Sequence, residues 1–381
     1  MLTTLLSGLW GRVGLLPLLA LATACSLNDV PLPATETAAP PTPYVLVTPD
    51  YFPTPQPVPV SNPLTVEGVA LGRRLFYETA LSVDNTVACA SCHAQEKAFT
   101  DGRARAVGVG GQQHPRSAMS LANLLWEPTL AWDGSSTALE AQARTPLENP
   151  IEMHQLLPAS VARLQALPKY PPLFRKAFGS SVITSENLLK ALAQFERTLV
   201  SANSRFDEFK RGNPAALTSF EKQGLLLFNT HPIAGSRGVR GGNCSDCHAG
   251  NLQAGHDFAN NGLDLTFTDL GRAAVTGFAA DRGRFRVPSL RNIELTGPYM
   301  HDGRLANLDS VLNHYNEHIA FGSPNLDPII TNASNLGNPL PGQPPLGLGL
   351  TATEKAQIVA FLKTLTDTTF THNPRFGPPR D

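Results

Sequence analysis

The sequence predicts a mainly α-helical protein in which one small domain occurs twice, with long loops and little β-structure. The first observation is a cysteine motif at Cys89–His93 that returns at Cys244–His248. A similar segment precedes each motif, Gly72–Phe76 before the first and Gly224–Phe228 before the second. A matching apolar helix follows each motif further along the chain. A set of features that recurs in the same order indicates a duplicated unit.

The two closing helices resemble each other in detail. Each places four apolar side chains on one helical face. They are Leu188, Leu192, Phe195 and Leu199 in the first half, and Ile358, Phe361, Leu362 and Leu365 in the second. Both helices end in Phe-x-x-Thr-Leu. Thr351 and Glu354 form a capping box, which predicts where the last helix begins.

The remaining segments predict loops. No run alternates as a strand would, residues 251–286 are rich in Gly and Asp, and residues 335–349 are rich in Pro and Gly. A chain of 381 residues is long enough for two domains with extensions. We assign residues 63–205 to the N-terminal domain and 206–381 to the C-terminal domain.

The charge balance excludes one class of function. Thirty Lys and Arg oppose 31 Asp and Glu, for a formal net charge of −1. Such a balance provides no basic surface for a polyanion. We therefore expect no nucleic-acid partner.

The first 24 residues are typical of an export signal. Arg12 is their only charged residue, and the Leu-rich run 13–21 leads through small residues to Cys25. The run is too short to span a membrane as a helix. A cysteine at this point is similar to a bacterial lipoprotein site, in which Cys25 becomes the acylated N-terminus. The alternative is plain secretion, with Cys25 inside the discarded signal.

A Pro-rich segment follows at residues 25–62. Such a composition does not bury a core and predicts an extended spacer between a lipid anchor and the folded body. A lipid anchor at Cys25 is then the only expected link to a membrane.

The paired cysteines predict two covalently bound haem groups. In Cys-x-x-Cys-His, two thiols three residues apart can each bond one vinyl group of haem c, and the His ligates the iron. Cys89, Cys92 and His93 form the first motif, and Cys244, Cys247 and His248 form the second. A thioredoxin-like pair would not need the His twice, and zinc would need ligands converging on one centre. The two predicted domains are therefore cytochrome c-like.

Further segments surround the two motifs in a characteristic order. They are Leu121-Ala122-Asn123, Trp132-Asp133-Gly134, Gln142, Asn149–Met153, Phe285–Asn292 and Thr296–Gly303. With these segments, the chain resembles the bacterial dihaem cytochrome c peroxidase superfamily from about residue 63 to residue 367. The resemblance implies an oxidoreductase that acts on hydrogen peroxide, on the periplasmic side of a Gram-negative envelope.

The resemblance also implies roles for individual residues. Hydrogen peroxide would react at the N-terminal haem, where Glu152 and Gln142 match the active-site residues and Pro146 would line the pocket. A buried carboxyl group can take a proton from one peroxide oxygen and return it to the other. Trp132 matches a tryptophan between the haems that can relay electrons. Trp126 is expected to be an ordinary core residue.

The distal ligand of the second haem distinguishes branches of the superfamily. Peroxidases that take electrons from a cytochrome carry a Met fourteen residues after the His of Pro-Tyr-x-His-Asp-Gly, and that position is Tyr315 here. Tyrosine is the pattern of MauG, which oxidises tryptophans of a partner protein through a high-valent state of both haems. A phenolate favours oxidised iron, whereas a thioether favours ferrous iron. Met300, His314 and His318 are rival ligands.

Segments 98–103 and 114–117 are more similar still to the methanobactin-associated dihaem enzymes, the MbnH group. Those enzymes act on a tryptophan of a small copper-binding protein. We therefore expect a protein substrate in the periplasm or at the cell surface. The alternatives are a cytochrome c peroxidase supplied with electrons by a small cytochrome or copper protein, and a dihaem electron carrier. The carrier would leave Glu152 and Gln142 without a role.

Two departures from the superfamily pattern bear on the site. Where other members carry a loop His that closes off the first haem, this chain has Val109 and Gly110, and His114 lies a few residues later. The carbonyl ligands of an interdomain calcium ion match Thr296 and Pro298, but the accompanying Asn is replaced by Ser117. The sequence therefore does not decide whether calcium is bound. It contains no pattern that predicts the oligomeric state.

Overall fold

The computed structural model describes residues 39–232, 239–255, 257–333 and 347–380. The predicted export signal, Cys25 and most of the loop at 335–349 lie outside the described residues.

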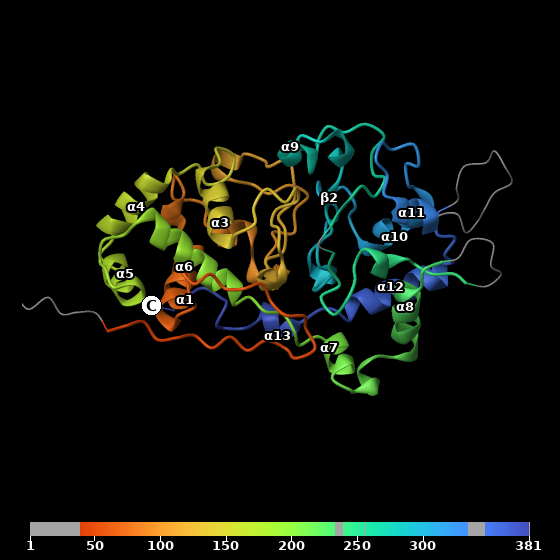
Figure 1. Cartoon of the computed structure of the whole chain (residues 1–381), viewed down its shortest axis with the longest axis horizontal. Coiled ribbons are helices and arrows are strands. Elements are labelled where there is room, and N and C mark those ends of the chain that lie inside the picture. Colours follow the sequence, from red (N-terminus) through yellow and green to blue (C-terminus); the bar gives the residue numbers. More distant parts are fainter. Residues whose placement is uncertain (1–38, 233–238, 256, 334–346, 381) are drawn as a thin grey trace, which may run out of the picture. The chain divides into compact units, whose positions relative to one another are not determined.

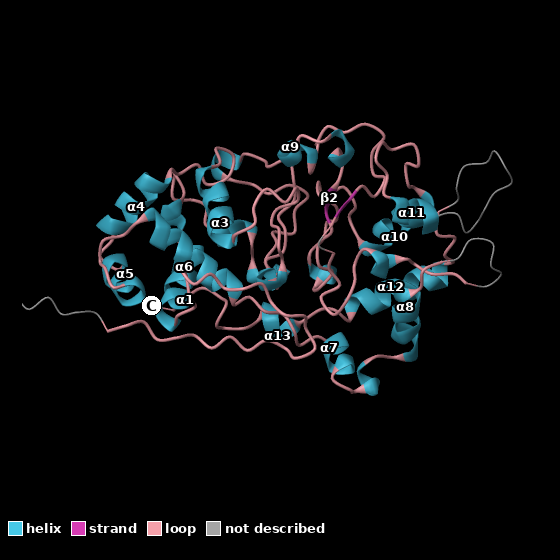
Figure 2. Cartoon of the chain, viewed as in Figure 1, coloured by secondary structure: helices cyan, strands magenta, loops and turns pink. Residues whose placement is uncertain are grey.

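The expected mainly helical architecture with long loops is confirmed (Figures 1 and 2). The first half contains α1 Val66–Phe76, α2 Cys89–Cys92, α3 Leu139–Glu148, α4 Leu157–Ala166, α5 Tyr170–Phe178 and α6 Ser185–Arg197. The second contains α7 Arg205–Lys210, α8 Ser219–Asn229, α9 Ala273–Thr276, α10 Leu308–Glu317, α11 Pro328–Ala333, α12 Ala352–Lys363 and α13 Thr368–Thr371. Short 3₁₀ helices are η1 Thr79–Leu81, η2 Gln95–Lys97, η3 Val109–Gly111, η4 Leu124–Trp126, η5 Pro214–Ala216, η6 Cys244–Asp246, η7 Ala279–Asp281 and η8 Ile293–Leu295. In the described residues the only sheet pairs β1 Phe258–Ala259 with β2 Phe285–Arg286, antiparallel.

Each half is built on one close helix pair, α1 with α6 and α8 with α12. Glycine makes both pairs possible. A Cβ atom at Gly72 would overlap the carbonyl oxygen of Ala191, and one at Gly224 would overlap that of Gln357. The repeated glycine therefore marks a repeated crossing of two backbones.

The repeated Phe-x-x-Thr-Leu ending also has a structural cause. The Thr198 hydroxyl donates to the Phe195 carbonyl oxygen at 2.7 Å, and Thr364 donates to Phe361 at the same distance. Each Thr caps its helix with this bond. The Leu that follows is fully buried in both halves. The predicted apolar faces of both closing helices are buried as well, and the predicted capping box begins α12.

The apolar core divides into two main clusters, one in each half. The C-terminal tail returns to the first of them, where Phe370 and Phe376 are buried. Phe370 lies 5.3 Å from Phe99, ring centre to ring centre. The blue tail in Figure 1 accordingly ends beside α1. The tail thus packs against the segment that follows the first cysteine motif.

Part of the Pro-rich segment differs from the expected free spacer. Residues 39–62 contain no helix, but Phe52 is buried and packs edge-on against Trp126 at 5.2 Å. The indole nitrogen of Trp126 donates to the Pro53 carbonyl oxygen at 2.8 Å. Trp126 is 2% exposed, as expected of a core residue. A few apolar side chains are enough to hold this segment against the folded body, although proline prevents regular structure there.

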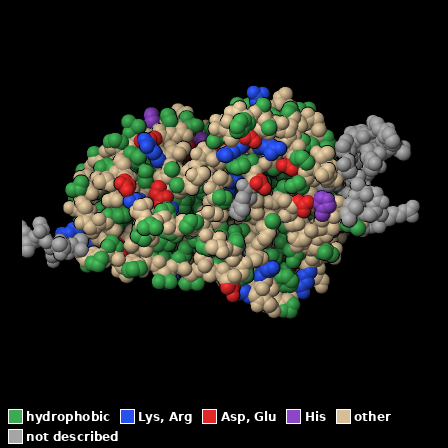
Figure 3. Space-filling view, in the orientation of Figure 1, with side chains coloured by type: hydrophobic (Ala, Val, Ile, Leu, Met, Phe, Trp, Pro, Cys, Tyr) green, Lys and Arg blue, Asp and Glu red, His purple; other side chains and the backbone are tan. Residues whose placement is uncertain are grey.

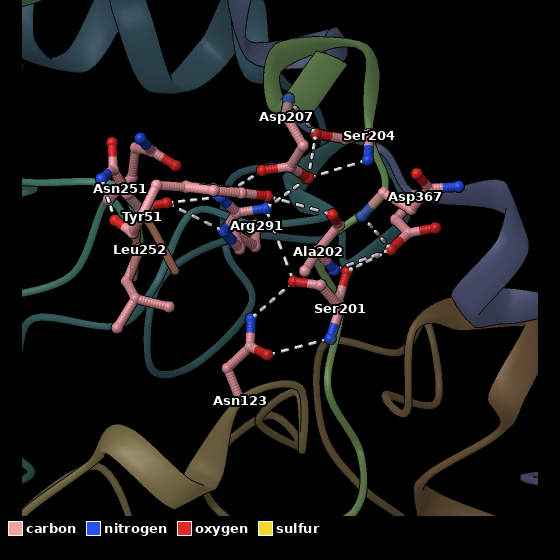
Figure 4. Close-up of polar contacts among 12 residues, drawn as sticks. Tyr51, Asn123, Ser201, Ala202, Ser204, Asp207, Asn251, Leu252, Arg291 and Asp367 are labelled. Carbon is pink, nitrogen blue, oxygen red and sulfur yellow. Dashed lines mark hydrogen bonds and ion pairs between the residues drawn. The ribbon is translucent and has the colours of Figure 1, made fainter. Parts of the chain in front are cut away.

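A buried polar network joins the two halves (Figure 4). At its centre, Arg291 makes two bonds to Asp207, of 2.7 and 2.8 Å, and both side chains are fully buried. The Arg291 guanidinium also lies over the Phe52 ring at 4.6 Å. Ser201 exchanges bonds with Asn123 of the first half and donates to Asp367. Because every member is paired, the network holds the halves in one arrangement.

Candidate active site

The first cysteine motif forms α2 and the residue after it. His93 Nδ1 donates to the Phe99 carbonyl oxygen at 2.8 Å. This bond fixes the tautomer and leaves Nε2 free as an iron ligand. The surrounding protein desolvates His93 and lowers its pKa, so the ring is neutral, as a ligand must be.

The second motif repeats this arrangement. His248 Nδ1 donates to the Pro288 carbonyl oxygen at 3.0 Å, and desolvation lowers the pKa of His248 to about 4. Desolvation also raises the pKa of Cys92 and Cys247 to about 11 and that of Cys244 to about 12. A redox-active pair needs a lowered thiol pKa. The environment therefore fits thiols that become thioethers better than a thioredoxin-like pair.

A cavity of about 250 Å³ adjoins the second motif. Its walls are largely apolar and include Cys244, Cys247, His248, Tyr315 and Met300. An apolar cavity with two thiols and an imidazole with a free Nε2 at its edge fits a haem c group.

The residues predicted to react with peroxide lie on α3 and in the turn that follows it. Gln142 and Pro146 are one turn apart on α3, and the turn after α3 folds back so that the Met153 amide donates to the Pro146 carbonyl oxygen at 3.1 Å. This return brings Glu152 toward the first motif, and its charge acts on the pKa of His93. The Gln142 Oε1 atom is buried and has no hydrogen-bond partner among the described residues. An acceptor without a donor fits a site that binds a hydroxylic molecule beside the haem.

Glu152 is held by its own turn. Its Oε1 atom accepts from Asn149 Nδ2 at 2.6 Å and lies 3.6 Å from His114 Nε2. The carboxylate is about a quarter exposed, so it can exchange protons with its surroundings.

Trp132 lies where the halves meet and lines the same cavity as His248 and Tyr315. Its Nε1 atom donates to the Ser117 carbonyl oxygen at 3.0 Å, and its own carbonyl oxygen accepts from the Arg286 amide at 2.7 Å. Arg286 in turn forms a buried ion pair of 2.6 Å with Glu127. A residue of the second half, Arg286, therefore helps to fix the position of Trp132, which belongs to the first half.

The four rival distal ligands of the second site lie in different surroundings. Tyr315, on α10, and Met300 both line the cavity. The His314 ring donates through Nε2 to the Asn261 carbonyl oxygen at 3.0 Å, and His318 is exposed. Asn261 Nδ2 lies 3.4 Å from the Tyr315 hydroxyl and 3.3 Å from Met300 Sδ. Burial raises the pKa of Tyr315 to about 12. Iron would therefore have to replace the proton for this side chain to ligate as phenolate.

Comparisons with known proteins agree with this geometry. A family model described as di-haem cytochrome c peroxidase matches residues 66–215. Methylamine utilization protein MauG of Methylorubrum extorquens is 42% identical over 262 residues, 68% of this chain and 71% of that protein. Cytochrome c551 peroxidase of Nitrosomonas europaea is 33% identical and covers 82% of this chain and 83% of its own. The chain belongs to the dihaem cytochrome c peroxidase and MauG family.

A solved structure supports the same assignment. It is a MauG-like protein associated with microbial copper homeostasis, with a TM-score of 0.76 and 36% identity over 88% of this chain and 99% of its own. This dihaem peroxidase is therefore an oxidoreductase that acts on hydrogen peroxide and has two haem c cofactors.

Both expected calcium ligands of this dihaem peroxidase, Thr296 and Pro298, lie beside the cavity, and so does Ser117, which replaces the Asn of the superfamily pattern. The Ser117 hydroxyl donates to the Met300 carbonyl oxygen at 3.1 Å. Within the described ranges no group of three His, Cys, Asp or Glu side chains could hold a metal ion. Calcium binding would therefore depend on carbonyl, hydroxyl and water oxygens, which Ca²⁺ accepts, and it stays a prediction.

Several residues of the dihaem peroxidase site were not predicted. Asn261 lies in a loop with no periodic pattern that could have revealed it. Arg116 binds Asp133 at 2.6 Å and Asp269 at 2.7 Å, and so ties the turn after Trp132 to the second half. The sequence singled out His114 only by its position and did not predict its contact with Glu152.

None of the described helices is long and apolar enough to cross a membrane. On the face drawn in Figure 3, acidic and basic side chains are interspersed. This distribution agrees with the balanced composition.

Proposed function

We propose that this dihaem peroxidase uses hydrogen peroxide to oxidise a partner protein at long range, as MauG does. The observation that carries the proposal is the presence of Tyr315 in the same cavity wall as His248. It occupies the position at which donor-dependent peroxidases have methionine. A phenolate there favours oxidised iron and makes the second site a poor store of electrons.

The chain's own residues have distinct tasks at the first site. When bound, the two haem c groups supply the iron that reacts with peroxide and holds the oxidising equivalents. Glu152 takes a proton from one peroxide oxygen and returns it to the other, which makes the cleavage heterolytic. The Gln142 Oε1 atom accepts a hydrogen bond from the peroxide hydroxyl, and Pro146 helps to exclude water.

The protein substrate supplies two electrons from outside, and Trp132 carries them between the two sites. A tryptophan side chain of an exported protein is the proposed target. A partner that handles copper is the first to test, because one similar protein of known structure is associated with microbial copper homeostasis.

A second candidate is a cytochrome c peroxidase that takes electrons from a small donor protein. Met300 favours it, because its sulfur lies in the same cavity and as close to Asn261 as the Tyr315 hydroxyl does. A thioether ligand would favour the ferrous iron that such an enzyme needs.

Replacing Tyr315 by Met tests the choice between the two. We expect the reduction potential of the second haem to rise by on the order of 100 mV or more, within the span of about 0.8 V that axial ligands set. The state formed by one equivalent of peroxide should also decay faster. Spectroelectrochemistry and stopped-flow absorption measure the two effects.

The matched control is Met300→Leu. It should leave the potential and the resting EPR spectrum unchanged if Tyr315 is the ligand. A changed spectrum in Met300→Leu, with none in Tyr315→Met, would instead support the donor-dependent peroxidase.

We also propose that the protein is exported and held by a lipid at Cys25. The variant Cys25→Ala should move from the membrane fraction to the soluble periplasmic fraction, because the acyl chains would be absent. Immunoblotting of cell fractions measures the change. Equal distribution of the two proteins would favour plain secretion.

A further inference from the structure

A hairpin at residues 106–114 lies against the proposed peroxide site. Its two sides pair at Val107 and Gln113, and the His114 amide donates to the Ala106 carbonyl oxygen at 2.8 Å. At its turn, the Gly108 amide donates to the Gln112 carbonyl oxygen at 2.8 Å. His114 is thus the last residue of a hydrogen-bonded hairpin, and its backbone is held in place by that hairpin.

The hairpin is fastened to the backbone of Glu152. The Val109 amide donates to the Glu152 carbonyl oxygen at 2.8 Å. A Cβ atom at Gly108 would overlap Ile151 and Glu152, so glycine permits this approach. The position of His114 relative to the carboxylate is therefore set by two backbone contacts as well as by its own side chain.

The Nδ1 atom of His114 has a hydrogen-bond partner whether or not it carries a proton. It lies 3.1 Å from the Arg116 amide nitrogen, which donates, and 3.3 Å from the Arg116 carbonyl oxygen, which accepts. Nε2 faces Glu152 Oε1 at 3.6 Å. An imidazole that can hold its proton on either nitrogen is suited to pass one on.

The peroxidase reaction requires such a supply. Each turnover follows H₂O₂ + 2 H⁺ + 2 e⁻ → 2 H₂O, with the electrons coming from the protein substrate or donor. Glu152 can move a proton between the two peroxide oxygens, but it cannot provide both protons that are consumed. They must come from solvent. The His114 and Glu152 side chains are 27% and 26% exposed, so the pair can be reached from outside.

We propose that His114 is a positioning residue that relays solvent protons to Glu152. The transfer runs from Nε2 to Oε1 and needs a small approach of the two side chains or one intervening water, because 3.6 Å exceeds a hydrogen bond. The relay rests on the proposed role of Glu152 and deepens it.

The test uses the loaded protein and the steady-state rate at which it reduces hydrogen peroxide with ascorbate as the electron donor, because the two solvent protons are consumed when the electrons arrive. His114→Gln keeps a hydrogen-bond donor but cannot relay, and we expect its rate to fall about tenfold, as for other outer partners of a reacting group. The rate of His114→Gln should rise with the concentration of a buffer acid, while the wild-type rate should not. His154, exposed two residues after Glu152, supplies the control His154→Gln, which should behave as wild type.

Two further measurements distinguish a proton-relay role of His114 from a purely structural one. The resting EPR spectrum should stay unchanged in His114→Gln, and the infrared carboxylate band of Glu152, identified with Glu152→Gln, should shift. In the Glu152→Gln background, His114→Gln should have no further effect. A wild-type rate in His114→Gln, or a slow rate that buffer acid does not restore, would overturn the relay. If Glu152→Gln itself reacts at the wild-type rate, the proposed acid–base role of Glu152 is contradicted, and the relay that depends on it is contradicted with it.

Discussion

Replacing Glu152 by Gln is expected to slow the reaction of the diferric protein with hydrogen peroxide by about 10²- to 10⁴-fold, the usual contribution of a positioned acid–base group. Glutamine keeps the size of the side chain and can still pair with Asn149, so the loss would come from proton transfer. Stopped-flow absorption under single-turnover conditions measures the rate directly.

Glu96→Gln is the matched control for Glu152→Gln. Glu96 is exposed and lies three residues after His93, so the variant removes the same charge near the same haem site. Its rate should equal that of wild type. Similar slowing in both variants would attribute the effect to charge near the haem and would remove Glu152 from the proposed mechanism.

Replacing Arg291 by Met is expected to lower the free energy of unfolding by about 3–5 kcal/mol, because it leaves the Asp207 carboxylate buried and unpaired. Desolvation alone would raise the pKa of Asp207, but Arg291 and Ser204 hold it below its usual range. Methionine fills similar space without a charge. Chemical denaturation followed by circular dichroism measures the loss.

The pH dependence of Arg291→Met gives a second check. In wild type the pair stabilises the protein at neutral pH, and this contribution is lost as the pH falls through the lowered pKa of Asp207. In the variant Asp207 should take up a proton more readily, so the difference from wild type should shrink on acidification. Arg282→Met, at an exposed position, should change stability by less than about 0.5 kcal/mol. A loss of that size in Arg291→Met would contradict the proposed importance of the pair.

The same network explains why some features could not be predicted from the sequence. Arg291 and Asn292 were recognised only as parts of a family segment. Their partners Asp207, Ser201 and Asp367 come from distant parts of the chain and follow no periodic pattern. The Pro-rich segment was predicted to be a spacer, because its composition does not reveal that Phe52 packs on Trp126 and under Arg291.

Local chemistry determined the rest. The haem attachment points follow from a five-residue motif with two cysteines three residues apart, and the duplicated helices follow from helical periodicity, a glycine and a capping threonine. These patterns act within a few turns of chain, so they can be read directly from the sequence. The contacts of His114 with Glu152, Asn261 with Tyr315 and Phe370 with Phe99 join segments that are distant in sequence. Only the tertiary structure decided them, because each depends on how separate loops pack around the same two sites.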